Sequence, residues 1–325
     1  MSYRILPILC TRALTAAIAV ALPIRDLAPQ DANIQMRAAR VETLLRDSAL
    51  KPVASQGSRF KGDRTEHVLL TFSDTTAIEV KWAVAPQGGE AFNNQPRYEA
   101  AAYELQKLFL DERDYVVPPT ALRMIPQSVF AASPGLKGEP TFEGSSAVLV
   151  ALQYWTADVT AEGVFNQKRA DRDSVYARHL GDLNILTYLI RHRDANKGNM
   201  LVSADSTNPR LFAVDNGVAF NSPPSNRGTD WQYMRVKRVS GATAARLRDI
   251  TDERLTGALA VVAQFERQGN DYVASAPGPN LDAGKGVRRK GSTLQLGLTS
   301  DEIAAVRGRL KDLVKDIDSG KIKTF

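Results

Sequence analysis

The sequence predicts an α+β fold of two lobes: a small β-rich amino-terminal lobe with one helix, and a larger, mainly helical carboxyl-terminal lobe. Alternating apolar residues predict a strand hairpin at 68–72 and 77–82, around a turn at 73–75. Apolar residues at three- and four-residue spacing predict helices at 98–109 and 176–190. The 325 residues suffice for one bilobal unit, and 43% hydrophobic with 24% charged residues is ordinary for a globular chain. We place the lobes at 34–153 and 154–325.

The second strand of this hairpin carries a candidate phosphate ligand. Glu79, Lys81 and Ala83 share one face of the strand, and a lysine on a β-branched strand is typical of those that bind nucleotide phosphates. A solvated lysine is the common alternative. The following helix starts near Pro96 and places Glu99 in its first turn, eighteen residues after Lys81. We expect Glu99 to pair with Lys81; Glu104 is the rival partner, and a surface role for either glutamate is the alternative.

The loop after the second helix carries the strongest functional signal. It runs from His192 through Arg193 and Asp194 to Asn199 and reads H-R-D-x-x-x-x-N; Asp215 follows sixteen residues later, after an apolar run. Phosphoryl transfer needs one carboxylate to orient the attacking group, and a second carboxylate with an amide oxygen to hold Mg²⁺. Asp194, Asp215 and Asn199 supply these groups in that order, with His192 and Arg193 completing the catalytic loop. The motif arises by chance in about one chain per thousand of this length.

The metal ligands flank a predicted strand pair. Strands are expected at 200–202 and 210–214, joined by a turn at 205–208. Asn199 precedes the first strand and Asp215 follows the second, so their side chains can converge on one ion. Hard oxygen ligands predict Mg²⁺, with Mn²⁺ as the alternative, bound together with ATP.

These residues together resemble the protein-kinase-like superfamily. Residues 188–194 (YLIRHRD) followed by 213–220 (AVDNGVAF) are similar to the type II phosphatidylinositol 4-kinases, in which Y-I-I-R-N-x-D precedes A-I-D-N-G-L-A-F. Residues 98–105 and 116–120 resemble bacterial relatives of that branch and of secretory-pathway kinases. The resemblance spans residues 60 to 235 and implies a bilobal kinase-like fold that moves the γ-phosphate of ATP to a hydroxyl acceptor.

The resemblance also implies a hinge between the lobes. Two sequence motifs of typical protein kinases are missing from this chain. The apolar strand 147–155 would lead into a hinge that contacts adenine around Leu152, Gln153 and Tyr154; a plain core strand is the equal alternative. No G-x-G-x-x-G covers the phosphates, and the nearest substitute is Ser55-Gln56-Gly57-Ser58, which could cradle phosphate through backbone amides or form a simple turn. No A-P-E follows Asp215, which leaves the acceptor undefined.

The rest of the chain is plainer. We expect loop inserts at 123–144 and 269–297, the second of them mobile, and a helix at 303–317 that begins with a capping box at 299–302. Net charge is +6, and the basic clusters at 235–238 and 288–290 could meet phospholipid headgroups, nucleic acid or acidic protein, although a solvated face is the favoured interpretation. We do not expect nucleic acid as a partner. Only Cys10 and three histidines are present, which excludes a zinc-binding spacing.

The amino terminus predicts export. Arg4 and Arg12 precede an apolar run at 13–22, which has the length of a signal-peptide core and is too short for a typical transmembrane helix. A polar linker follows to residue 33. A signal peptide would direct the protein to the periplasm or outside the cell, where ATP is scarce. A membrane tether or a cytoplasmic amphipathic helix is the alternative.

Three functions fit the sequence. The first is an ATP-dependent phosphotransferase acting on a lipid, protein or small-molecule hydroxyl, which the intact polar machinery favours. The second is a pseudokinase or nucleotide-binding interaction protein of the bacterial envelope, which the irregular phosphate loop favours. The third is an unrelated envelope binding protein whose motifs arose by chance.

Overall fold

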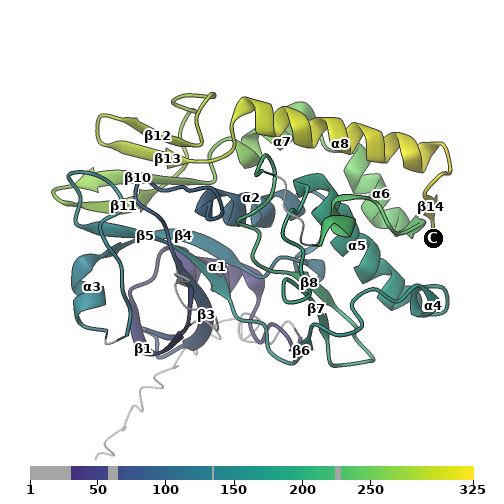
Figure 1. The fold of residues 1–325 in the computed structure, drawn as a ribbon, viewed down its shortest axis with the longest axis horizontal. Coiled ribbons are helices and arrows are strands. Elements are labelled where there is room, and N and C mark those ends of the chain that lie inside the picture. The colour runs from purple at the N-terminus through teal and green to yellow at the C-terminus, as the bar shows by residue number, and fades with distance from the viewer. Residues whose placement is uncertain (1–30, 58–64, 134, 224–227) are drawn as a thin grey trace, which may run out of the picture.

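The computed structural model describes residues 31–57, 65–133, 135–223 and 228–325 (Figure 1). It confirms the predicted α+β fold: a five-stranded sheet forms one end of the molecule, α4 (Gln167–Ala170), α5 (Ser174–Ile190) and α6 (Gly241–Arg248) form the other, and α2 (Pro96–Gln106) lies between them (Figure 1). The predicted signal peptide, Cys10 and Ser58 lie outside the described residues. Among the described helices, none is both long and apolar enough to cross a membrane.

The five-stranded sheet is antiparallel, in the order β1-β2-β3-β5-β4. Its strands are β1 (Leu50–Gly57), β2 (Thr65–Phe72), β3 (Ala77–Val84), β4 (Thr120–Pro126) and β5 (Ala147–Tyr154). The predicted hairpin is confirmed as β2 and β3, in which Lys81 lies opposite His67. Successive side chains alternate between the two faces. Val80 and Trp82 are buried on one face with helix α1 (Ala38–Arg46), so Lys81 lies on the other. We call this second face the Lys81 face.

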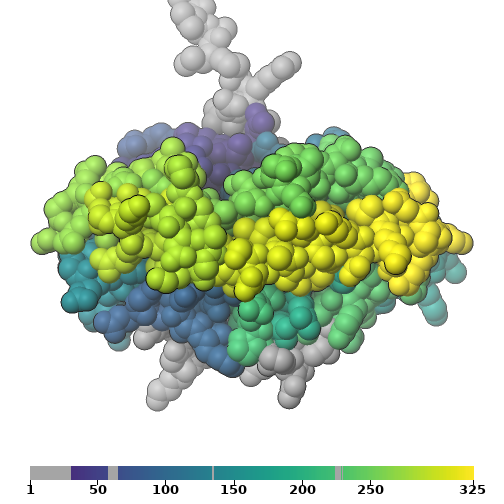
Figure 2. Space-filling view, turned by 90° about the horizontal axis from the view of Figure 1, so that it is seen from above, coloured from purple at the N-terminus to yellow at the C-terminus, as the bar shows by residue number. Residues whose placement is uncertain are grey.

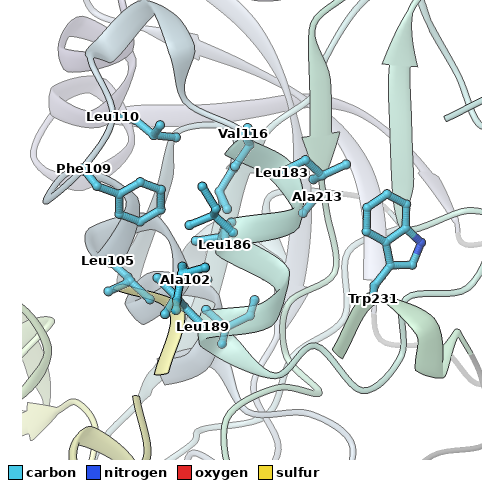
Figure 3. Close-up of a cluster of buried hydrophobic side chains, with 14 of the residues drawn as sticks. Ala102, Leu105, Phe109, Leu110, Val116, Leu183, Leu186, Leu189, Ala213 and Trp231 are labelled. Carbon is cyan, nitrogen blue, oxygen red and sulfur yellow. The ribbon is translucent and has the colours of Figure 1, made fainter. Parts of the chain in front are cut away.

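Helix α2 (Pro96–Gln106) joins the sheet to the helical lobe. Ala100 packs in a cluster with side chains of the Lys81 face, such as Ala83 and Ala151. Ala102, Leu105 and Phe109 pack with Leu183, Leu186 and Leu189 of α5 (Ser174–Ile190) in a second apolar cluster (Figure 3). Because α5 is buried along most of its length, it fixes the start of the loop that follows it.

The remaining elements complete the helical lobe and its rim, except α3 (Gln127–Ala131), which packs against β4 of the five-stranded sheet (Figure 1). They are η2 (Glu112–Asp114), α3 (Gln127–Ala131), β6 (Val159–Thr160), α4 (Gln167–Ala170), β7 (Met200–Ser203), β8 (Leu211–Ala213), η3 (Thr229–Gln232), β9 (Arg238–Val239), α6 (Gly241–Arg248), α7 (Asp252–Leu259), α8 (Ser300–Asp318) and β14 (Lys323–Thr324). The predicted capping box at the start of α8 is confirmed, since Thr299 and Glu302 each bond the other's backbone N–H. Strands β6, β7 and β8 form a small antiparallel sheet, and β14 pairs with β9.

Both predicted loop inserts are wrong in part: the described residues of 132–144 and 276–286 contain no helix or strand, but the rest of each range contains regular elements. Residues 123–144 begin within β4 and continue into α3. Residues 269–297 belong to a second antiparallel sheet, formed by β10 (Ala263–Gln268), β11 (Asp271–Ser275), β12 (Val287–Lys290) and β13 (Thr293–Leu296). Glycines at positive φ close its tight turns, and Phe265, Tyr272 and Leu294 bury one face against the Lys81 face near β4. Figure 2 shows this sheet and α8 side by side across one surface of the molecule.

One residue of the 288–290 basic cluster does not lie on the solvated face that we expected. Arg288 is 1% exposed, and its guanidinium donates to the backbone carbonyls of Ala260, Asp282, Lys285 and Leu298. It therefore ties together the segments around β12 and β13. The other members of the 288–290 cluster are exposed.

A buried ion pair anchors α2 to the carboxyl-terminal segment. Arg97 donates to both carboxylate oxygens of Glu302, at 2.6 and 3.0 Å, and to Glu90 at 2.7 Å. Tyr98 also donates to Glu302. Burial opposes ionisation of Glu302, but the hydrogen bonds and charge of Arg97 outweigh it and lower the pKa of the carboxyl. The amino end of α8 thus fixes the first turn of α2.

Glu302→Ala should lower the free energy of unfolding by about 3–5 kcal/mol, because it leaves the buried Arg97 guanidinium without its main partner. Urea denaturation measures this. Asp301→Ala is the matched control, since Asp301 is an exposed acid in the same helical turn. Equal losses in the two variants would show that the ion pair does not anchor α2.

A buried carboxyl in α5 gives the fold a pH dependence. Asp182 is 1% exposed and accepts a hydrogen bond from Thr243 of α6 at 2.8 Å. Burial raises the pKa of Asp182 to about 7, against the smaller opposing effect of the Thr243 hydrogen bond. The folded chain therefore holds this proton more tightly than the unfolded chain does.

Asp182→Asn should remove that pH dependence. The stabilising contribution of protonated Asp182 is complete below its unfolded pKa of about 4 and is lost as pH rises through about 7. Wild type should therefore lose stability relative to Asp182→Asn across this window, by up to about 1.4 kcal/mol per pH unit. Denaturant titrations from pH 4 to 8 measure the difference; parallel curves for the two proteins would contradict the assignment.

Candidate functional site

The end of α5 sets the position of the 192–199 loop. Arg191 ends the helix in a left-handed conformation with φ of 50°, and the next amide, that of His192, donates to the Thr187 carbonyl at 2.9 Å. The Arg193 amide then donates to the Val218 carbonyl at 2.9 Å. The loop is therefore held from both the helix and the segment after β8.

His192 and Arg193 are buried beneath the loop. His192 is 0% exposed, and its Nδ1 accepts from the Asp194 amide at 3.3 Å. Burial lowers the pKa of His192 to about 4, and the nearby charge of Asp215 only partly opposes it, so the imidazole is neutral at pH 7. Burial also lowers the pKa of the Arg193 guanidinium. In this geometry the two side chains support the loop from within the core.

Asp194 and Asn199 are linked through the loop itself. The Asn199 side-chain nitrogen donates to the Asp194 carbonyl at 2.5 Å, and the Asn196 side chain lies 3.4 Å from Asp194 Oδ1. Asn196 Oδ1 in turn accepts from the Gly198 amide at 2.9 Å. The Asn199 side-chain nitrogen is engaged within the loop, which leaves its side-chain oxygen as the atom that could accept a further bond.

The strand pair brings Asn199 and Asp215 together, as the sequence predicts. Strands β7 and β8 are antiparallel, with Met200 opposite Ala213, and the Val214 amide donates to the Asn199 carbonyl at 2.9 Å. Asp215 follows with φ of 61°, a left-handed conformation that aspartate tolerates better than most residues. This conformation directs the chain out of β8 beside Lys81.

Lys81 is the centre of the site. Its Nζ donates to Glu99 Oε1 and to Asp215 Oδ1, each at 2.8 Å. Burial alone would lower the pKa of Lys81, but the charges of Asp215 and Glu99 outweigh it and raise the pKa. The Lys81 charge lowers the pKa of Asp215 in turn. The other oxygen of Glu99 accepts from the Asn216 amide at 2.9 Å, so one ammonium links β3, α2 and the segment after β8.

The rival partner Glu104 lies elsewhere. It pairs with Lys107 at 2.7 Å, one turn further along α2, and Lys107 also contacts Glu42 at 2.9 Å. Of the two glutamates considered from the sequence, Glu99 is therefore the one that meets Lys81.

The side-chain oxygens of Asn199 and Asp215 are of the chemical type that divalent cations prefer. Within the described residues, no group of three or more His, Cys, Asp or Glu side chains is arranged to hold a metal. Asn199 and Asp215 offer an amide and a carboxylate oxygen at the end of one strand pair, which is the hard donor set that Mg²⁺ takes when phosphate oxygens and water complete its shell.

The predicted hinge residues occupy opposite faces of β5. Gln153 is the cross-strand partner of Lys81, but its side chain is 3% exposed and donates to Thr120 at 3.0 Å. The Tyr154 side chain packs in the cluster on the face opposite Lys81, where its hydroxyl accepts from the Gln35 amide at 3.3 Å. The Gln153 side chain therefore bonds toward β4 on the Lys81 face, and the Tyr154 side chain lies on the other face.

The predicted phosphate loop lies at the end of β1. Ser55 is paired with Val68 and Gly57 with Glu66, whereas the residue opposite Lys81 on β2 is His67. Ser55 and Gly57 therefore belong to the face opposite Lys81. Ser58, the last residue of the predicted phosphate loop, lies outside the described residues.

Sequence reasoning missed a cavity beside the catalytic loop. It has a volume of about 380 Å³ and is lined by Ala195 to Lys197 on one side and by Phe165, Trp231 and Arg235 on another. The Arg235 guanidinium lies 3.8 Å from the Phe165 ring centre and 5.0 Å from that of Trp231. Arg235 was visible in the sequence only as part of a basic cluster. Nothing local marked the two aromatic residues.

Comparisons with known proteins define the similarity as distant. No protein-family model and no curated protein matches the sequence. A solved structure of Fam20 from hydra, with sugar, is 16% identical over 85% of this chain and 87% of that chain, with a TM-score of 0.49. A MAP kinase structure from Leishmania major is 14% identical over 56% of this chain and 50% of that chain, with a TM-score of 0.30. Likeness at this level does not distinguish between functions.

Proposed function

We propose that the protein is an ATP-dependent phosphotransferase that moves the γ-phosphate to a hydroxyl group. The single observation that carries this proposal is the Lys81 ammonium, which contacts both Glu99 and Asp215 at 2.8 Å while Asp215 lies beside Asn199 at the end of β7 and β8. Phosphoryl transfer depends mainly on positioning and charge, and this arrangement supplies a fixed cation next to a hard-oxygen cation site.

Each polar group has a distinct task in this proposal. Lys81 binds the α- and β-phosphates, and Glu99 holds its ammonium in place. Asn199 and Asp215 would hold Mg²⁺, which neutralises phosphate charge when bound. Asp194 accepts a hydrogen bond from the acceptor hydroxyl and aligns its oxygen for in-line attack on the γ-phosphorus. As the new O–P bond forms, the proton leaves toward the carboxylate, the bond between the γ-phosphorus and the β–γ bridging oxygen breaks, and ADP is the leaving group. The buried His192 keeps the Asp194 backbone in position.

The cavity beside the catalytic loop is the proposed acceptor site. Asp194 immediately precedes Ala195, Asn196 and Lys197 in its lining, so a hydroxyl carried into the cavity would approach the Asp194 carboxylate. Its volume of about 380 Å³ suits a side chain, a headgroup or a small molecule. A pseudokinase would share the Lys81 site but would show no transfer, which makes the transfer assay below decisive between the two.

Lys81→Met should abolish stabilisation by nucleotide. A ligand at about a hundred times its Kd adds roughly 2.7 kcal/mol to stability, which a thermal-shift assay with Mg²⁺-ATP detects in wild type. Lys107→Met is the matched control, because Lys107 also bridges two carboxylates of the same lobe. Both variants lose an ion bridge and should melt earlier without ligand, but only Lys81→Met should lose the ATP-dependent shift. An undiminished shift in Lys81→Met would remove Lys81 from the nucleotide site.

Asp194→Asn should separate binding from transfer. The amide keeps the size of the side chain but loses the charge that accepts the proton, so phosphate transfer should fall at least about a hundredfold. Mg²⁺-ATP affinity should stay within a few-fold, because Asp194 faces the acceptor. Labelled ATP incubated with separate lipid, protein and small-molecule pools measures transfer, with Asp205→Asn as a control in the turn after β7. Transfer at the wild-type rate in Asp194→Asn would refute its role.

A further inference from the structure

Three polar and aromatic side chains gather on the Lys81 face next to Lys81. His67 of β2 lies directly opposite Lys81 of β3, and Glu79 precedes Lys81 by two residues on β3. Trp155 follows Gln153, the partner of Lys81 on β5, by two residues, and its amide donates to the Glu79 carbonyl at 2.9 Å. Since alternate residues share a face, all three side chains project from the Lys81 face.

These side chains form an ordered, exposed stack. The rings of His67 and Trp155 are 4.0 Å apart and inclined by 20°, and His67 Nε2 lies 3.2 Å from Glu79 Oε2. Trp155 is nevertheless 44% exposed, whereas the other two tryptophans, Trp82 and Trp231, are 0% and 7% exposed. The Glu79 carboxylate thus fixes the imidazole against an indole that remains open to solvent.

The place of this stack fits the base of a nucleotide whose phosphates lie at Lys81. Glu99 and Asp215 close the α2 side of the ammonium, so the rest of the nucleotide must extend the other way. Glu79 is two residues from Lys81 along β3, about 7 Å at the rise of a strand, a separation that a ribose can bridge.

The backbone near Trp155 has few amides left to read a base. The Tyr154 amide donates to the Pro119 carbonyl at 2.8 Å, the Trp155 amide to Glu79, and the Ala157 amide to the Asn33 carbonyl at 3.1 Å. Recognition by stacking needs none of these groups, because every nucleobase has a π-face.

We infer that Trp155, supported by His67 and Glu79, is a stacking platform for the nucleobase of a nucleoside triphosphate, and that it discriminates weakly between bases. This inference rests on the proposed function, since it takes the phosphates to bind at Lys81. It assigns base binding to the exposed indole and away from the Gln153 and Tyr154 side chains.

Tryptophan fluorescence and calorimetry on the full chain test the platform. Mg²⁺-ATP and Mg²⁺-GTP should both quench the emission of Trp155 and bind with Kd values within about tenfold of each other, because stacking is tolerant of base identity. Trp155→Ala should weaken both nucleotides by roughly 5- to 150-fold, the range measured for lost base stacking. Trp155→Phe should retain most of the affinity and lose the quenching. Phe325→Ala, which removes another aromatic side chain with 44% exposure, should bind as wild type does.

The outcomes separate this inference from the proposed function. If ATP binding depends on Lys81 but Trp155→Ala binds within twofold of wild type, the platform is refuted and the proposed function stands. Binding of GTP more than a hundredfold weaker than ATP would also overturn the stacking mode. If neither nucleotide shifts the melting temperature of wild type, the proposed function fails and the platform fails with it.

Discussion

The site depends on one ammonium shared by two carboxylates. Lys81 contacts Glu99 and Asp215 at equal distances of 2.8 Å, and the second oxygen of Glu99 accepts the Asn216 amide. Three segments that are far apart in sequence therefore meet at one charge. The Lys81 and Glu99 side chains are 13% and 7% exposed, whereas that of Asp215 is 55% exposed. Removing Lys81 and Glu99 from water costs several kcal/mol per ion, which close geometry and further hydrogen bonds must offset. A buried ion pair of this kind contributes little net stability, so the proposed binding of phosphates explains it better.

Helix α2 is held from two directions, through residues only two positions apart. Glu99 faces Lys81 in the sheet, while Arg97 reaches the amino end of α8 through Glu302. The second sheet packs against the same face of the β-rich lobe. The carboxyl-terminal third of the chain therefore positions α2, the helix that carries Glu99. This contact also helps to fix the Glu99–Lys81 ion pair.

The sequence was sufficient for the parts of the site that are encoded locally. The spacing of Lys81 to Glu99, the loop ending at Asn199 and the hairpin before Asp215 each depend on one or two elements, and the structure brings these residues together. It was not sufficient where partners are remote. Glu302 was recognised as part of a helix cap, but its bond to Arg97 spans 205 positions and leaves no local pattern. The strands at 263–296 are short and carry several charged residues, and glycine-containing segments separate them, so their alternation was too weak to outweigh the turn signals. Gln153 and Tyr154 were identified as a pair, although the pleat sends adjacent side chains to opposite faces.

The Arg97–Glu302 bond also has a consequence for the order of events during synthesis. At about 5–20 residues per second, a ribosome needs roughly ten to forty seconds to make the 205 positions that separate the two partners. During that interval the β-rich lobe has been synthesised, but Glu302, the partner of Arg97, has not. The second sheet, which covers apolar side chains of this lobe, is also still missing. The β-rich lobe is synthesised first, but it cannot complete its packing until the carboxyl-terminal third has been made. In the nascent chain, the incompletely packed β-rich lobe therefore exposes apolar side chains, and it is the part to which a chaperone would bind.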